Sequence, residues 1–367
     1  MGALGLSLAA AGLLGTAFSL PRALLTLPAG ILVERIGPTR MMHAGMGLVL
    51  SGTLVAATAT SLTRMALARA LVGLGYGATA LVGIVYLMQA GPGNQRTRRG
   101  NMYEGSLISA NAVSGYMAGG VSVYVGWRWG FGVAAIAVGA GWVTATWRVL
   151  PIIRTMLQAR TVPVVADATP EPARRPAPLA LFAIYLVAFG LAFGWAGAIV
   201  TLAPLYGGQV LGLNAAAIGR ALALGYVVEA SLLIPVGWTA DTFGRVRVLL
   251  PGMAVLVSGV ALLPLTTGLA GYTLACVLVI VGMTSWMIPA SLLAEHLHGR
   301  FGSRAVSLYR FITDLGMVAA PAIVGWLTGR AGFGVGATAI ALVLVGCAAV
   351  FGVVMGPRRR RPVRDSR

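Results

Sequence analysis

The sequence predicts an all-α protein that crosses a membrane many times, and three observations support that fold class. Of the 367 residues, 58% are hydrophobic and only 10% are charged, whereas a soluble domain carries about 25% charged residues. Apolar stretches of about 20 residues recur from end to end, and that length lets one helix cross the hydrocarbon core of a bilayer. The 27 basic residues, all of them Arg, gather in alternate connections between these stretches, which is typical of the cytoplasmic side of membrane proteins.

Eleven spanning helices account for the apolar stretches, with the Arg-rich connections and the C-terminal tail on the cytoplasmic side. We expect these helices at residues 8–33, 41–61, 66–90, 102–123, 130–150, 178–205, 215–238, 247–267, 270–292, 304–327 and 334–356.

The count places Met1 outside, and the first half is about one helix shorter than the second. Gly30 lies 29 residues after Met1, whereas Gly237 lies 59 residues after Pro178. We therefore expect the natural protein to begin upstream with one more helix. A genuine eleven-helix protein is the alternative.

A Pro-rich segment that carries Arg and few bulky apolar residues divides the chain at residues 151–177. This composition is typical of a flexible linker, and we place it on the cytoplasmic side. We therefore expect an N-terminal bundle at 1–150, the linker at 151–177, a C-terminal bundle at 178–356 and a basic cytoplasmic tail at 357–367. Attraction to anionic lipids explains the basic tail.

The polar loop GILVERIGPTR (30–40) returns 207 residues later as GWTADTFGRVR (237–247). The first Gly of each copy lets two helices approach closely, and the second permits a left-handed turn. The acid between them can pair with an Arg of the same loop or cap a helix N-terminus. We expect these loops to form a cytoplasmic gate that holds two bundles together and releases them, with the residues Gly30, Glu34, Arg35, Gly37, Arg40, Gly237, Asp241, Gly244, Arg245 and Arg247.

The repeated loop resembles the signature G-x-L-x-D-R-x-G-R-R/K of the major facilitator superfamily, which lies between helices two and three and again between helices eight and nine. The first copy departs from it, with Glu34 for Asp and with Pro38 and Thr39 for basic residues. Three further stretches are similar to patterns of the family. RALVGLGYG (69–77) resembles helix four, GWRWGF (126–131) resembles the turn between helices five and six, and YRFITDLGMVAAP (309–321) resembles helix eleven. The resemblance implies two pseudo-symmetric helix bundles, with twelve helices in a full-length member, that rock around a midplane site.

Ionisable residues inside the spans are the first candidates for that site, because each costs about 2.5–3.5 kcal/mol on insertion scales. Arg22 and Glu229 lie 207 residues apart, at equivalent places of the two halves. The resemblance implies that helix two faces helix eleven, and we expect Arg22 to meet Asp314 there. The alternative is a pair that only holds the bundles together.

We expect Glu229 to open onto the central cavity and, with Asp314, to load and release a proton. Burial raises the pKa of a carboxyl and a neighbouring Arg lowers it, so a change of surroundings can move the proton. The alternative for Glu229 is a buried acid satisfied by a neighbouring helix.

Two further Arg residues have two interpretations each. By the resemblance, Arg69 steers a proton or an anion, and plain packing is the alternative. Arg310 either reaches the membrane surface with its charged end or pairs with Glu34 across the cytoplasmic gate. We include Arg22 and Arg69 among the residues of the substrate cavity, and Arg310 in the gate.

Aromatic residues and prolines add weaker signals. Trp195, Tyr226 and Trp286 would line a cavity for a flat organic ligand, with a core or lipid-facing role as the alternative. Pro204 and Pro289 would kink their helices, which suits bundles that rock.

These features predict a secondary transporter that moves a small organic molecule in exchange for protons. The stretch SGYMAGG (114–120) partly resembles a motif of drug/proton antiporters, which favours export. The alternative is proton-symport uptake of an anionic metabolite, for which Arg22 and Arg69 would have to be unpaired. No nucleophile–base set was found, and without Lys the chain has no Walker A phosphate loop, so we expect no enzyme.

The remaining expectations concern partners and location. Two His and one acid in EHLHGR (295–300) do not make a closed zinc site, and we expect neither metal nor cofactor. The placement of the positive charge follows topology, which argues against nucleic-acid binding. We expect a monomer in the bacterial cytoplasmic membrane, with its C-terminus in the cytoplasm and with lipid, protons and a small molecule as partners.

Overall fold

The computed structural model describes residues 7–26, 28–89, 96–159, 178–296 and 303–356, and the elements within them are helical. The first half forms α1 (Leu8–Thr26), α2 (Ala29–Ile36), α3 (Pro38–Ala57), α4 (Leu62–Gln89), α5 (Arg96–Tyr124), α6 (Trp127–Thr144), the π-helix η2 (Ala145–Val149) and α7 (Leu150–Ala159).

The second half contains more elements because several of its spans include short π- or 3-10-helical segments. It forms α8 (Pro178–Trp195), η3 (Ala196–Leu202), α9 (Ala203–Gln209), α10 (Ala215–Phe243), α11 (Arg245–Leu262), η4 (Leu263–Leu265), α12 (Leu269–Gly282), η5 (Met283–Ser285), α13 (Ile288–His296), α14 (Ser303–Ala331) and α15 (Phe333–Met355).

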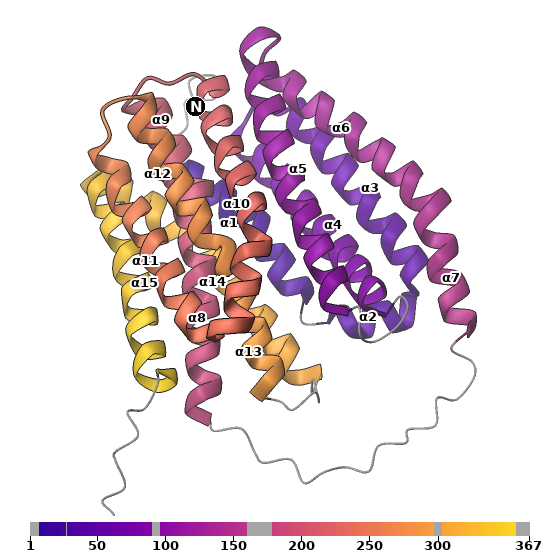
Figure 1. The fold of residues 1–367 in the computed structure, drawn as a ribbon. Coiled ribbons are helices and arrows are strands. Elements are labelled where there is room, and N and C mark those ends of the chain that lie inside the picture. Colours follow the sequence, from indigo (N-terminus) through magenta and orange to yellow (C-terminus); the bar gives the residue numbers. More distant parts are fainter. Residues whose placement is uncertain (1–6, 27, 90–95, 160–177, 297–302, 357–367) are drawn as a thin grey trace, which may run out of the picture.

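The helices form two bundles that stand side by side (Figure 1). The second bundle has one continuous core, in which Leu191, Leu256 and Ile340 from α8, α11 and α15 are fully buried. The buried core residues of the first bundle fall into smaller clusters, one around Met41 of α3 and another around Ala56. This all-α architecture of two bundles agrees with the predicted fold class.

The two bundles repeat each other in sequence position. The run α1–α2 covers 8–36 and α10 covers 215–243, an offset of 207 residues at both ends. The same offset relates α5, at 96–124, to α14, at 303–331. Each helix can therefore be compared with its counterpart residue by residue, and the predicted pseudo-symmetry is confirmed.

The turns repeat as well. Gly37 and Gly244 precede α3 and α11 with φ of 84° and 96°, in the region that favours glycine. Gly126 and Gly332 precede α6 and α15 with φ of 105° and 89°. The left-handed turn expected at the second Gly of each loop is confirmed.

Nine helices or continuous helical runs in the described part of the chain are long and apolar enough to cross a membrane. The two other expected spans, 41–61 and 102–123, correspond to α3, with 20 residues, and α5, with 29 residues. α5 is the more polar of the two, and it packs against α10 of the other bundle (Figure 1). The face of α5 that contacts α10 accommodates polar groups better than a lipid-facing one, and most residues from Ser109 to Ala118 are exposed.

The first expected span, 8–33, is wrong in its second half, because α1 ends at Thr26 and α2 begins at Ala29. Pro28 precedes α2; a proline has no backbone N–H and clashes with the preceding turn of a helix. At the equivalent register α10 contains Pro235 and continues to Phe243.

Local departures from α-helix lie before Pro204 and Pro289, and the kinks expected at these prolines stay a prediction. The π-helical segment η3 includes Val200, four residues before Pro204, and the 3-10 segment η5 includes Ser285, four residues before Pro289. A proline leaves the carbonyl four residues earlier without its usual donor, so the turn there can change its hydrogen-bonding pattern.

One helical run extends beyond its expected end. The span expected at 130–150 continues through η2 and α7 to Ala159, nine residues into the segment expected to be a linker. The rest of that segment, 160–177, and the tail at 357–367 lie outside the described residues.

Candidate functional site

Two helix pairs join the bundles: α1 packs against α14, and α10 packs against α5 (Figure 1). At the end of the molecule away from the repeated loops, both pairs meet through glycine. A Cβ added to Gly12 of α1 would lie 2.2 Å from the carbonyl oxygen of Pro321, and one added to Gly219 of α10 would lie 2.3 Å from that of Gly115. Since no real Cβ sits so close to an oxygen, helix backbones touch at both places.

Gly12 and Gly219 are themselves counterparts at the 207-residue offset. Their partner helices are counterparts too, so the same kind of contact is built twice. This end of the interface is therefore closed by two equivalent backbone contacts.

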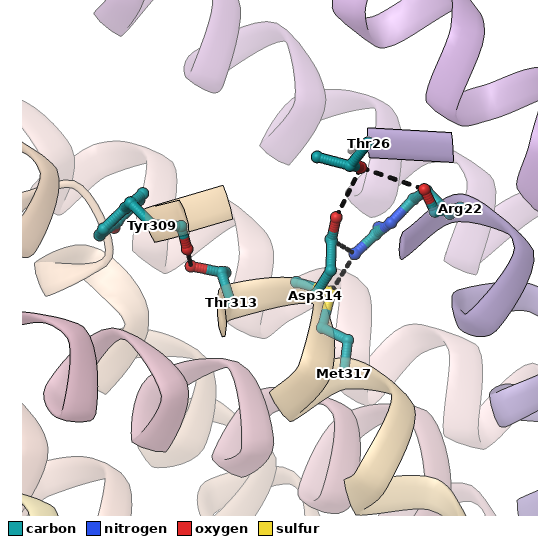
Figure 2. Close-up of polar contacts among 6 residues, drawn as sticks. All are labelled: Arg22, Thr26, Tyr309, Thr313, Asp314 and Met317. Carbon is teal, nitrogen blue, oxygen red and sulfur yellow. Dashed lines mark hydrogen bonds and ion pairs between the residues drawn. The ribbon is translucent and has the colours of Figure 1, made fainter. Parts of the chain in front are cut away.

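Toward the repeated loops, α1 and α14 are joined by a buried ion pair (Figure 2). Arg22 Nη2 donates to Asp314 Oδ1, and the two side chains are only 12% and 13% exposed. Thr26 Oγ1 donates to the other carboxylate oxygen of Asp314 at 2.8 Å, and Arg22 Nη2 lies 2.7 Å from Met317 Sδ. The predicted contact between Arg22 and Asp314 is confirmed.

Aromatic rings complete the surroundings of Arg22. The guanidinium carbon lies 5.8 Å from the ring centroids of both Phe18 and Tyr76, a distance at which a ring face attracts a cation. Arg22 Nε is buried and has no hydrogen-bond partner among the described residues. The positive charge is thus held by one carboxylate and two rings.

Glu229 occupies the equivalent position on α10 and has different surroundings. Its side chain is 5% exposed, and no described residue forms a hydrogen bond or an ion pair with it. The position on α5 that corresponds to Asp314 of α14 is Leu107, which has no polar group. The opening of Glu229 onto a cavity stays a prediction, and in this structure the residue is buried where α10 packs against α5. No described neighbour satisfies the carboxyl.

A second acid lies on the helix that faces Glu229. Glu104 of α5 is within electrostatic reach of Glu229 and of Arg310 on α14. Tyr76 is within reach of Arg22, Glu104, Arg310 and Asp314. These charges therefore form one polar cluster across the bundle interface.

The expected pair between Arg310 and Glu34 stays a prediction, because the side chain of Glu34 lies outside the described ones. Arg69 is exposed and has no ion-pair partner among the described residues, and its proposed role stays a prediction.

The three candidate aromatic residues belong partly to the core of the second bundle. Tyr226 is buried, and Trp195 and Trp286 pack against the core while remaining half-buried. Trp195 lies within side-chain hydrogen-bonding range of Tyr226, which precedes Glu229 by one turn of α10. Their predicted role in a cavity stays a prediction.

The second repeated loop contains the gate contact that the structure describes. Arg245 Nη1 lies 2.7 Å from Glu295 Oε1 of α13 and its Nη2 lies 3.8 Å from Asp241 Oδ1. The pairing within the loop was predicted, whereas Glu295 was not. The close approach expected at Gly237 is wrong, because no described atom lies within 4 Å of an added Cβ there. Arg35, Arg40 and Arg247 are exposed.

Sequence reasoning missed several groups around the ion pair. Thr26 follows Arg22 by one helical turn, and that spacing was an available signal. Tyr76 lies within the stretch RALVGLGYG, but its side of the helix could not be assigned without the packing. Within the described residues, no group of three or more His, Cys, Asp or Glu side chains is arranged to hold a metal ion.

Comparison with known proteins gives one family and two curated relatives. The family model of the Major Facilitator Superfamily matches residues 1–298. The relatives are each described as an uncharacterised MFS-type transporter, from Mycobacterium tuberculosis strains CDC 1551 and H37Rv, and each is 26% identical over 220 residues. The matched stretch covers 58% of this chain and 28% of each relative.

Proposed function

Because the chain belongs to the major facilitator superfamily of secondary transporters, we propose that it moves a small organic molecule across the membrane in exchange for protons. In this proposal Glu229 is the group that takes up and releases the proton.

The observation that supports this role is the absence of any described partner for a buried carboxyl. An ionised carboxylate in such a place is costly unless it is paired or hydrogen-bonded. Glu229 therefore binds a proton when α5 covers it and gives the proton up when the bundles rock and water reaches it. Binding of a proton is coupled to the position of the bundles in this way.

Asp314 is the second proposed proton carrier. A proton on Asp314 would remove the charge that holds Arg22, and the link between α1 and α14 would weaken. The glycine contacts at the other end keep that side closed while this change occurs. The two ends of the interface can then open in turn, as alternating access requires.

Export is favoured by the stretch SGYMAGG, two of whose glycines face α10. A Cβ added to Gly119 would lie 2.5 Å from the carbonyl oxygen of Ala215, and Gly115 supplies the oxygen that faces Gly219. The stretch that partly resembles an antiporter motif therefore lies on the contact between bundles.

Uptake of an anionic metabolite is the second candidate, and Arg69 supports it. Arg69 is exposed and unpaired among the described residues, so it can receive an anion. Arg22 supports it less, because Asp314 already neutralises its charge.

The test is ethidium accumulation in efflux-deficient bacteria that produce the full chain. We expect the chain to lower accumulation, an uncoupler to abolish that effect, and Glu229→Gln to behave like the uncoupler. The matched control is Ser231→Ala, which changes an exposed residue two positions after Glu229 on the same helix, and it should retain export. Membrane levels of each variant are compared by immunoblot.

Export by Glu229→Gln that still depends on the proton gradient would contradict the role of Glu229. If no form exports ethidium, purified protein in vesicles under an inward proton gradient is tested with labelled succinate. Uptake that requires Arg69 would then replace export with the second candidate.

A further inference from the structure

The outer face of the first bundle carries a cavity that the transport proposal does not use. α6, η2 and α7 lie at the edge of the molecule, beside α3 (Figure 1). Of the nine candidate spans, the run Trp127–Thr155 has the smallest buried share, 11%. A cavity of about 340 Å³ opens on this run, lined by Gly139, Trp142, Val143, Thr146 and Trp147.

The local sequence explains why a cavity forms there. The lining residues recur every three or four positions and so share one face of the helix. Gly139 has no side chain, which leaves a gap beside the two large Trp rings. The π-helix η2 begins directly before Thr146, and such insertions are frequent at functional sites.

One wall of the cavity is held in place by a neighbouring helix. Trp142 Nε1 donates to His43 Nδ1 of α3 at 2.8 Å. A Cβ added to Gly47 of α3 would lie 3.5 Å from the ring of Trp142, so the ring rests close to that backbone. The opposite wall, Trp147, is 76% exposed. The cavity is thus an open, mostly apolar hollow on one helical run, with Trp142 held in place and Trp147 open to lipid.

Arg40 and Arg154 lie beyond the cavity at the end that carries the repeated loops, and Arg148 directly follows Trp147. Leu150 and Ile153 of α7 pack with Met41 of α3, and the adjoining residues Arg154 and Arg40 are exposed. Arg154 follows Trp147 by two helical turns, about 10 Å along the axis. Neither Arg154 nor Arg40 has an ion-pair partner among the described residues.

We propose that this cavity binds one acyl chain of an anionic phospholipid whose phosphate lies against Arg154 and Arg40. Apolar walls that open sideways admit a lipid chain, and basic side chains at the cytoplasmic end of spanning helices bind anionic headgroups. A phospholipid joins both features in one molecule, with its phosphate at the membrane surface and its chains below it. This inference does not depend on which molecule is transported.

The test uses the purified full chain in phosphatidylcholine vesicles that contain brominated lipid, since bromine on an acyl chain quenches nearby Trp fluorescence. Brominated phosphatidylglycerol should bind about thirtyfold more strongly than brominated phosphatidylcholine, the ratio given by about 1 kcal/mol for each of the two Arg residues. The extra quenching should fall most in Trp147→Leu, which removes the more exposed of the two Trp reporters in the cavity, and should also fall in Arg154→Gln.

The matched control is Arg128→Gln, an exposed Arg at the other end of α6, which should leave the preference unchanged. Equal quenching by the two brominated lipids would overturn the proposal. A loss in Arg128→Gln as large as that in Arg154→Gln would also overturn it, because the preference would then reflect net charge and not this site. Arg154 is exposed, so its variant is expected to fold, and size-exclusion profiles check this.

Discussion

The interface between α1 and α14 and the interface between α10 and α5 are built on the same plan and differ at one depth. At the closed end, Gly12 and Gly219 make equivalent contacts with the backbone of the partner helix. At the middle, Arg22 is paired with Asp314, whereas Glu229 faces a helix that has Leu107 where Asp314 would correspond. The scaffold is symmetric and its charges are not.

This difference suggests a division of labour. An ion pair that is buried and hydrogen-bonded is expensive to break, so under the proposed function α1 and α14 would hold their position until a proton reached Asp314. A lone carboxyl responds to water and charge near it, so α10 and α5 would then be the pair that senses the proton. Four predictions test this comparison.

The largest effect is expected from giving Glu229 an oppositely charged partner, as Arg22 already has in Asp314. Leu107→Arg places a cation at the position that corresponds to Asp314, and it should hold Glu229 in its charged form. We expect proton-dependent ethidium export to be lost as completely as in Glu229→Gln. Leu107→Met, which keeps the position apolar, should export normally, and export by Leu107→Arg would show that the two positions do not face each other.

Removing one member of the existing pair should produce the largest loss of stability. Asp314→Leu leaves a buried Arg22 without its anion, which we expect to lower the free energy of unfolding by about 3–5 kcal/mol. SDS-induced unfolding from mixed micelles measures this change. The double variant Arg22→Leu with Asp314→Leu should recover most of it, and a double variant as unstable as the single one would mean that packing, not charge, is lost.

The two glycine contacts should respond alike. Gly12→Ala and Gly219→Ala each force a methyl group against a carbonyl oxygen, and we expect each to cost about 1–3 kcal/mol in the same assay. Gly237→Ala is the control, since an added Cβ there meets open space, and it should not destabilise. A clear loss of unfolding free energy at only one of the two positions would show that the two glycine contacts are not equivalent.

The smallest effect is expected at the ion pair outside the interface. Arg245 and Glu295 are 2.7 Å apart, but the Glu295 side chain is 55% exposed. Exposed pairs contribute about 1 kcal/mol or less, so Glu295→Gln should change the unfolding free energy by no more than that. A loss comparable with that of Asp314→Leu would show that the loop, and not the buried pair, carries the link between helices.

The fold and the central contact could be predicted because they depend on regularities along the chain. The 207-residue offset and the glycines at 37 and 244 predicted the repeated turns. Membrane depth, counted from the loop, together with the family resemblance, predicted that Arg22 would meet Asp314.

What could not be predicted depends on contacts between helices that share no sequence regularity. Glu295 lies 50 residues from Arg245, and nothing in the spacing connects them. The gap between α1 and α2 was also missed, because Pro28 and Pro235 occupy the same register and only the first lies between separate helices. The burial of Glu229 depends on how closely α5 lies against α10, which residue counting does not give.

The π-helical turn η3 has a mechanical consequence. In the run from Pro178 to Gln209, α8 and α9 are joined by the π-helical segment Ala196–Leu202. A π-helical turn lacks the regular i to i−4 hydrogen bonds that stiffen an α-helix, so the backbone bends more easily there. Both α8 and α9 pack in the core of the second bundle, so we expect this section to permit small shifts of one half of the span relative to the other and not a free swing.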